Sequence, residues 1–549
     1  MRLFLLLVIS LWFSSVLAQE KTDSVWNFYD FKVNSNQYEL DFQKKINRDS
    51  LVYSVLDSLK NGGFYTLTLD SIQNRNVYMN KGKMYQKIWV KSDSVFVKKE
   101  DWFAIQNLDS LIQSANQYFA KKGFPFVEIT IQDLGYRENE LQIGLNYRLL
   151  EKRTIDGVQV QGYEKLSKGF IKHGLGLKKG MIYNESELLK LSERMNYNSM
   201  IEEIRPAQTL FNTDSTTIYL YVNKVKSNVF DGILGFGNDL DGKFQLNGSV
   251  LIELNNNFNS MERIRLNWRS TPDKTTSLDL NVRIPYLFSS PLGSQTQLNL
   301  FKQDSTYVNT KLEERLFYQI TMNSNLGVNF SFEDSNFVLN EQPGLASLYD
   351  DFTKTGIGMS YEYILLSSNR LFEGKSKIYL SGKALTRKKQ ETDTQTLEIF
   401  DKKSKQYEVG GEWFHLFRLH PQHYIKTDVE AYALLGDDEF SLNELYRIGG
   451  FGSIRGFNEE SLVASAYGII SLEYRFLPNE NFYISVFGDY AYLENKPAKI
   501  QENLGGTGAG FSFLTQLGVF NLSYAVGRQS KTGFDFKSSK IHFGIVARF

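Results

Sequence analysis

The segment Tyr446–Phe457 has the residue types best suited to chemistry in this 549-residue chain. Its sequence is Tyr-Arg-Ile-Gly-Gly-Phe-Gly-Ser-Ile-Arg-Gly-Phe. Its four glycines permit a compact backbone, and Arg455 stands between apolar neighbours that include Ile454. Those neighbours favour a buried arginine over an exposed, disordered loop, and a buried guanidinium needs carboxylate partners. Glu473 and Asp489, on strands predicted just downstream, are available. The spacing therefore predicts an internal ion cluster that holds a folded loop.

Other patterns give no support to an enzyme or to a metal protein. The chain has no cysteine, which excludes disulfides, thiolate nucleophiles and cysteine-ligated metals. His420 and His423 lie close together but have no carboxylate nearby, so we predict no metal site. The glycine run Gly505–Gly510 leads into the strand-like Phe511–Leu514 and not into a helix, so it is read as a strand bend and not as a phosphate loop. We expect no catalytic residues and no cofactor.

The N-terminus is typical of a secretory signal peptide. Arg2 precedes the apolar run Leu3–Ile9, and a small-residue site ends at Ala18, so we predict that residues 1–18 are removed. A membrane anchor is the alternative, but the apolar run is short for a span. Gln19 leaves no cysteine there for lipidation. Lys plus Arg and Asp plus Glu both number 62, so no net charge points to nucleic acid.

Residues 227–549 are predicted to form a transmembrane β-barrel. Helical periodicity stops after Lys226, and sixteen segments of about ten residues alternate apolar and polar residues between Asn, Asp, Gly and Ser clusters. The first begins near Val229 and the last near Lys540. The chain is 14% aromatic, as the ends of such strands require. A soluble β-sandwich also alternates, but it explains neither the signal peptide nor sixteen long strands.

Loop lengths predict which end of the barrel faces outward. Outer-membrane barrels have short periplasmic turns and longer external loops. The connections from odd to even strands include the four longest ones, which are predicted to lie outside: Ser335–Lys354, Leu385–Lys405, Gly436–Ser465 and Leu493–Gly505.

The region before the barrel is predicted to be mixed α/β. Residues 152–226 fit the order βααββ, and residues 83–151 fit a similar order, with a helical part near Trp102 to Lys122. Residues 19–82 form a weak copy or a helical segment, so the number of repeats, two or three, stays open.

The motifs together resemble the BamA/TamA family of outer-membrane assembly factors, whose members carry periplasmic POTRA repeats of βααββ form before a sixteen-stranded barrel. The family's lumen-loop motif matches Ile454-Arg455-Gly456-Phe457, in a loop at about 436–465. Its motif partners match Glu473, Phe487 and Asp489. The resemblance covers nearly all of the mature chain and implies that this loop folds into the lumen.

Two further features fit the resemblance. The chain ends in a pattern similar to the C-terminal β-signal of outer-membrane barrels, with Ala547 smaller than the family expects; its residues are His542, Gly544, Ala547 and Phe549. The first strand contains Gly232, Gly235 and Gly237, which weaken strand pairing and fit a lateral gate between the first and last strands.

The resemblance implies a non-enzymatic protein that assists insertion or translocation of polypeptides at the bacterial outer membrane, with its N-terminal domains in the periplasm. Its expected partners are outer-membrane lipid, unfolded outer-membrane proteins bound by POTRA edge strands, and accessory periplasmic or lipoprotein subunits. An exporter of one dedicated secreted protein, of the two-partner-secretion type, is the alternative. Such exporters carry two POTRA repeats and often a proline-containing linker, whereas the first proline here is Pro125. A passive pore is a third hypothesis.

Overall fold

The chain forms two compact units in the computed structural model. The first contains the described residues up to 154 together with 182–186, and the second contains the remainder. The described residues are 25–30, 38–41, 48–73, 76–80, 82–85, 87–91, 102–105, 108–137, 140–196, 198–238, 244–271, 275–303, 306–337, 348–367, 369, 371–372, 374–392, 399–515, 518–530, 533–534, 537 and 539–547. The predicted signal peptide and Phe549 lie outside them.

The first unit contains two α/β copies with the same topology. The first copy consists of β1 (Val25–Asp30), β2 (Tyr38–Asp41), α2 (Arg48–Asn61), β3 (Thr68–Gln73) and β4 (Asn76–Asn80). The second consists of β5 (Lys87–Lys91), β6 (Trp102–Ile105), α3 (Leu108–Lys121), β7 (Val127–Arg137) and β8 (Glu140–Leu149). The sheet orders are β2-β1-β4-β3 and β6-β5-β8-β7, with β1 parallel to β4 and β5 parallel to β8. The two copies therefore repeat one supersecondary unit.

Helix α3 shows why these copies fold as they do. Leu108, Leu111, Ala115 and Phe119 are buried, at spacings that place them on one face of a helix. The helix ends before Gly123, whose φ of 93° is a left-handed conformation that glycine adopts without strain. The apolar face of α3 thus forms the core of its copy against the sheet.

The third copy belongs to the second unit and precedes the barrel. It consists of β9 (Gly157–Gly162), the π-helix η1 (Phe170–Gly174), α4 (Glu185–Asn196), β10 (Ile201–Phe211) and β11 (Thr216–Lys224), with the sheet order β10-β11-β9. Among the described residues, this copy alone has two helices between its first and second main strands.

The helical part predicted near Trp102 to Lys122 is partly wrong. Its first residues form strand β6, which pairs antiparallel with β5. The sequence Trp-Phe-Ala-Ile there is rich in residues that favour strands, and four residues are too few for a stable helix. Residues 25–80, predicted as a weak copy or a helical segment, repeat the strand and helix order of residues 87–149.

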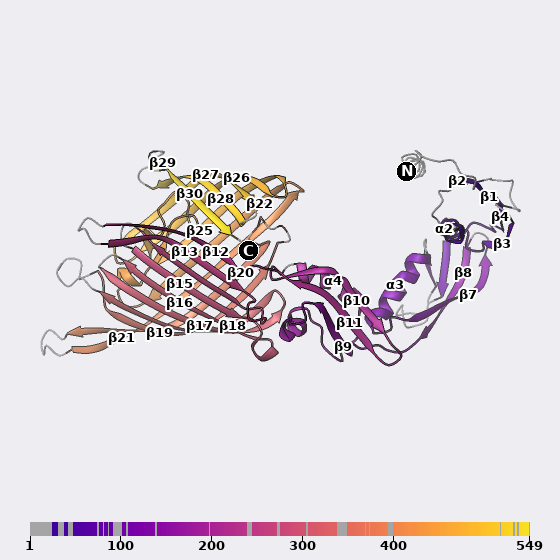
Figure 1. Ribbon diagram of the computed structural model, residues 1–549, viewed down its shortest axis with the longest axis horizontal. Helices are drawn as coiled ribbons and strands as arrows, with labels where there is room; N and C mark the ends of the chain where they lie inside the picture. Colours follow the sequence, from indigo (N-terminus) through magenta and orange to yellow (C-terminus); the bar gives the residue numbers. More distant parts are fainter. Residues whose placement is uncertain are drawn as a thin grey trace. The chain divides into compact units, whose positions relative to one another are not determined.

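Sixteen long antiparallel strands form the rest of the second unit, as predicted (Figure 1). The first eight are β12 (Val229–Asn238), β13 (Phe244–Asn255), β14 (Arg263–Ser270), β15 (Thr275–Ile284), β16 (Leu292–Gln303), β17 (Tyr307–Thr321), β18 (Ser324–Phe337) and β19 (Phe352–Leu365). The others are β20 (Ser376–Thr392), β21 (Ile399–His420), β22 (His423–Gly436), β25 (Ala466–Asn479), β26 (Phe482–Asn495), β27 (Ile500–Leu514), β28 (Gly518–Gln529) and β30 (Lys540–Ala547). Short elements lie between them: η2 (Leu287–Ser289), η3 (Leu442–Glu444), β23 (Tyr446–Ile448), β24 (Leu462–Ala464) and β29 (Gly533–Phe534).

The strands separate an apolar outer face from a polar inner one. On β25, Ile470 and Leu472 are more than half exposed, whereas Ser471 and Glu473 between them are buried. Neighbouring strands follow the same period, because successive side chains of a strand point to opposite faces. The outer face suits lipid, and the inner face encloses polar groups and charges.

The sheet has an open seam between its first and last strands. Strand β12 pairs with β13 over its whole length, including Gly232, Gly235 and Gly237. Strand β30 pairs with β28 and lies near β12, but no residue that the structure describes pairs β30 with β12. The glycines therefore do not prevent β12 from pairing with β13. On its other side, β12 makes no backbone pairing with any residue that the structure describes.

Two of the long connections predicted are short in the structure. Strand β20 extends to Thr392 and β21 already begins at Ile399. Only residues 496–499 separate β26 from β27. The connection 366–375 between β19 and β20, on the side where outer-membrane barrels have short turns, has ten residues. The sequence underestimates these strands because polar residues continue them beyond the apolar segments.

The third α/β copy is attached to two turns at one end of the barrel. The Tyr163 hydroxyl donates a hydrogen bond to Asn259 Oδ1 at 2.7 Å and accepts one from Asn256 Nδ2 at 3.1 Å. Phe170 of η1 packs against Tyr286, with ring centroids 6.2 Å apart. Polar and aromatic contacts thus join this copy to the β13–β14 and β15–β16 turns.

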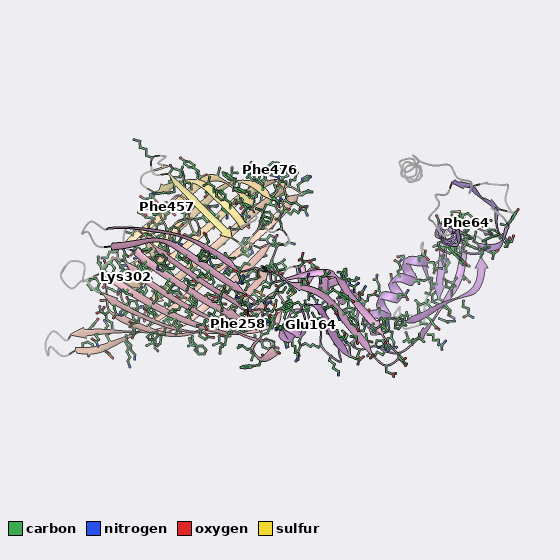
Figure 2. All side chains as sticks on the ribbon, viewed as in Figure 1. Phe64, Glu164, Phe258, Lys302, Phe457 and Phe476 are labelled. Atoms are coloured by element: carbon green, nitrogen blue, oxygen red, sulfur yellow. The ribbon has the colours of Figure 1, made fainter. Side chains whose placement is uncertain are left out.

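A buried carboxylate shapes the first of these turns, near the labelled Phe258 and Glu164 of Figure 2. Burial opposes ionisation of Glu262, but its hydrogen bonds from the Ser260 hydroxyl and from the N–H groups of Phe258 and Ser260 outweigh burial and lower its pKa.

Among the residues described, no helix is long and apolar enough to cross a membrane.

Candidate functional site

The loop that carries the arginine motif is a hairpin that lies along the inner face of the sheet. Strands β23 and β24 pair antiparallel, from Tyr446 with Ala464 to Ile448 with Leu462. The turn beyond them begins at Gly449, whose φ of 117° an L-residue rarely adopts. The Gly450 N–H then donates to the Ile454 carbonyl. This closed turn presents the next residue, Arg455, to the barrel wall.

Arg455 is held by two carboxylates at the wall. Its Nε and Nη2 donate to the two oxygens of Asp489 at 2.8 and 2.6 Å, and its Nη1 donates to Glu473 Oε2 at 2.6 Å. The backbone N–H of Arg455 adds a bond of 3.0 Å to Asp489. All three residues are at least nine-tenths buried. Forked pairing of this kind fixes both the position and the orientation of a guanidinium.

Apolar contacts surround this ion cluster. The Arg455 guanidinium lies 3.5 Å from the ring centroid of Phe487, close enough for a cation–π interaction. Ile454 is fully buried and, like Phe457 (labelled in Figure 2), belongs to a core that includes Ile469 and Leu504 of the barrel wall. The loop tip is therefore packed against the barrel wall as a protein core.

Glycines of the wall give the loop tip its close approach. A Cβ at Gly506 of β27 would collide with the carbonyl oxygen of Arg455, and a Cβ at Gly527 of β28 would lie 2.6 Å from that of Gly456. Gly456 itself has a φ of 93°, and a Cβ there would lie 2.5 Å from the Gly527 nitrogen. These three glycines form a slot in which backbone rests directly on backbone.

The last strand also contacts the motif. The Gly456 N–H donates to His542 Nε2 at 3.4 Å, a long bond, and Phe451 lies beside the same imidazole with centroids 6.1 Å apart. The structure thus joins two features that the sequence suggested separately, the lumen motif and the C-terminal pattern. Gly544 and Ala547 pair with Asn521 and Gly518 of β28.

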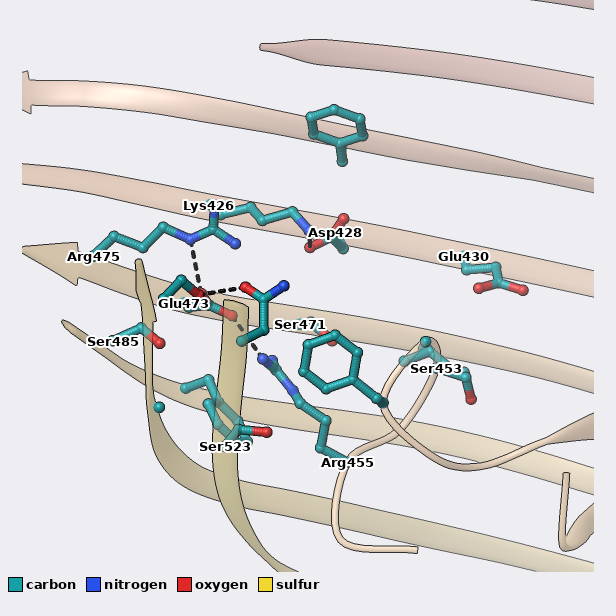
Figure 3. A pocket seen from close by; sticks show the side chains of 18 of the residues that line it. Lys426, Asp428, Glu430, Ser453, Arg455, Ser471, Glu473, Arg475, Ser485 and Ser523 are labelled. Carbon is teal, nitrogen blue, oxygen red and sulfur yellow. Dashed lines mark hydrogen bonds and ion pairs between the residues drawn. The ribbon is translucent and has the colours of Figure 1, made fainter. Parts of the chain in front are cut away.

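A polar cavity of about 370 Å³ lies beside the tip (Figure 3). Glu473 stands between Arg455 and Arg475, and it accepts a bond from Arg475 Nε at 2.7 Å. Other charged lining residues are Lys377, Glu412, Lys426, Asp428 and Glu430. No group of three or more histidines, aspartates or glutamates in the described part of the chain is arranged to hold a metal ion.

The predicted partners Arg455, Glu473, Phe487 and Asp489 therefore lie together. Three participants were not predicted, namely Gly506, Gly527 and Arg475. The run Gly505–Gly510 was read as a bend in the strand, but Gly506 makes room for the loop backbone. Its position opposite Asp489 in the strand register was the signal that could have identified it.

Comparison with known proteins assigns the family. A family model described as the Omp85 superfamily domain matches residues 233–549, which is more than half of the chain. The chain belongs to the Omp85 superfamily. It is therefore an outer-membrane protein of a bacterium, as its resemblance to the BamA/TamA family predicted. No curated protein sequence matches it significantly.

Three solved structures of low sequence identity are similar to this chain. CdiB from Escherichia coli is 13% identical with a TM-score of 0.50, over 91% of this chain and 97% of that one. BamA from Haemophilus ducreyi lacking POTRA domains 1-3 is 15% identical with a TM-score of 0.47, over 83% and 96%. CdiB from Acinetobacter baumannii is 14% identical with a TM-score of 0.49, over 99% and 97%. At such identities the similarity concerns the fold alone.

Replacing Arg455 by alanine should leave Asp489 buried without a counter-ion and Glu473 paired with Arg475 alone. We expect a loss of about 3–5 kcal/mol of stability, because an uncompensated buried charge costs that much. Heat-modifiable migration in gels and complementation of a deletion strain measure the effect. Arg418→Ala, at an exposed arginine, is the matched control. Wild-type migration together with full complementation by Arg455→Ala would contradict the buried anchor.

Replacing Gly506 by alanine should displace the loop tip, because the new Cβ collides with the Arg455 carbonyl oxygen. We expect a loss of ~1–3 kcal/mol, typical of overpacking. Gly468→Ala on β25 is the control, since its Cβ would meet no atom within 4 Å. Thermal unfolding of the purified variants measures both, and equal stability of the two would refute the glycine slot.

Proposed function

We propose that this Omp85 protein assists insertion of polypeptides into the outer membrane, with the three α/β copies in the periplasm as client-binding domains. The observation that carries the proposal is the Arg455 loop inside a barrel whose first and last strands do not pair through any residue that the structure describes. A loop that occupies the lumen obstructs the free passage of solutes, so this arrangement does not suit a passive pore. An open seam suits a protein that releases clients sideways.

The seam offers unpaired backbone to an incoming strand. Strand β12 satisfies its hydrogen bonds only toward β13 among the described residues, and its glycines lower the cost of separating strands there. An unpaired strand edge binds extended polypeptide through main-chain hydrogen bonds with little demand on sequence. A nascent barrel strand is such a polypeptide. We therefore infer that β12 and β30 form a lateral gate.

The number of α/β copies favours assembly over export. The chain carries three copies of the strand and helix order, whereas two-partner exporters carry two. Each copy ends its sheet in strands with a free edge, such as β3, β7 and β10. Strand β10 contains Pro206, which lacks a backbone N–H donor, and its pairing with β11 has two register shifts, so it is an irregular edge strand. Strand β7 has the same length, eleven residues, but only one register shift with β8 and no proline, so it is the more regular candidate.

Depletion of the protein, followed by quantitative proteomics of the outer membrane, tests the proposal. We expect many different barrel proteins to decrease together, because an assembly factor serves clients with little sequence preference. Loss of a single secreted protein with an intact outer-membrane proteome would instead establish a dedicated exporter. A change in solute uptake alone would establish a pore, and either result would overturn the assembly role.

A further inference from the structure

A second buried ion cluster holds the beginning of the same loop on a different part of the wall. Glu444, the last residue of η3, has a side chain that is 0% exposed. Its Oε2 lies 2.7 Å from Lys354 Nζ on β19 and 3.3 Å from Arg387 Nε on β20. Gln406 Nε2 donates to the same oxygen at 3.2 Å. The two carboxylates that bind Arg455, those of Glu473 and Asp489, lie by contrast on β25 and β26.

Local structure fixes Glu444 for this contact. The Ser441 N–H donates to Glu444 Oε1 at 2.6 Å, and the two residues form a capping box around η3. One carboxylate oxygen thus caps the helix, and the other faces the two cations. Residues of the loop itself thus hold this side chain in the orientation that its contact with the wall requires.

The neighbouring loop takes part in the cluster. Asp350 Oδ2 accepts from Arg387 Nη2 at 2.9 Å and from the Ser441 hydroxyl at 2.6 Å. The Leu442 N–H donates to the Leu348 carbonyl at 2.8 Å. Residues before β19 and the start of the arginine loop therefore meet at the end of the barrel opposite the third α/β copy.

A buried ion network of this kind contributes little net stability compared with apolar residues, because desolvation offsets the attraction between the charges. It does fix geometry, since each charge needs its partner in place. We propose that Glu444 is a positioning residue that anchors the loop 436–465 to β19 and β20 independently of Arg455, and so keeps this mouth of the barrel closed.

The consequence for transport rests on the proposed function, whereas the anchor itself does not. Glu444 and Arg455 tie the loop to two parts of the wall, and Arg447 adds bonds to Gln303 and to the Tyr307 hydroxyl, so the loop spans the inner space of the barrel. Passage of a polypeptide along the axis requires release of the Glu444 anchor, but exit through the β12–β30 seam does not. The two anchors therefore bias the protein toward lateral release.

The absence of cysteine in the natural chain permits a direct test on the purified full-length protein. Ser331→Cys reports on the wall near the Glu444 cluster. The side chains of Ser331 and Leu385 both lie against Gly356 of β19, the strand that also carries Lys354. Ser485→Cys reports on the cavity at the Arg455 tip. The rate of reaction with a maleimide measures how often each site opens. It requires no client, so its outcome is independent of the assembly role.

Glu444→Gln keeps the capping side chain and removes the charge. We expect it to raise the labelling rate of the cysteine at 331 by about tenfold, as local opening becomes easier, with the rate at 485 unchanged. Glu439→Gln, an exposed acid of the same loop, is the control and should change neither rate. No change at 331, or an equal rise at both sites, would overturn an independent anchor.

Lys354→Met breaks the same pair from the barrel side and serves as the second variant. It should reproduce the labelling pattern of Glu444→Gln. Heat-modifiable migration verifies that each variant is folded. If neither variant yields a folded barrel, Glu444 is a folding determinant of the whole sheet, and the proposal of a loop anchor is wrong.

Discussion

The structure depends on how the charge and the hydrogen-bond donors of one buried guanidinium, that of Arg455, are paired. Arg455 is buried beside apolar residues of the loop and of the wall, and such a charge is tolerated only with matched acceptors. Asp489 and Glu473 supply them from adjacent strands, and this requires β25 and β26 in register. The glycine slot on β27 and β28 brings the loop backbone close enough for the same contact. One ion cluster thus connects the loop to four consecutive strands.

The loop is consequently a structural partner of the strands nearest the seam. Its tip touches β28 through Gly527 and the last strand through His542. Any movement of β30 away from β12 changes the support of the tip, and any displacement of the tip exposes the charges. At the other end of the loop, Glu444 fixes the remaining hairpin to strands far from the seam. The lumen is therefore occupied by a tethered element and is not a free channel.

The sequence predicted the periodic parts of this protein well. Sixteen strands follow from alternation alone, and Arg455, Glu473 and Asp489 follow from a cation among apolar residues with acids nearby. Contacts that depend on strand register were not predictable from one sequence. Glu444 is 90 residues from Lys354, and the role of Gly506 appears only when β26 and β27 are aligned. Strand β6 was misassigned because tertiary pairing with β5 decides its conformation.

The lateral gate is the central claim, and a reversible lock between β12 and β30 tests it most directly. Cysteines placed on these two strands would be the only thiols in the chain. If the seam must open, the oxidised protein fails to support assembly of other barrels in reconstituted membranes, and a reductant restores it. Full activity of the oxidised, disulfide-locked protein would contradict the account.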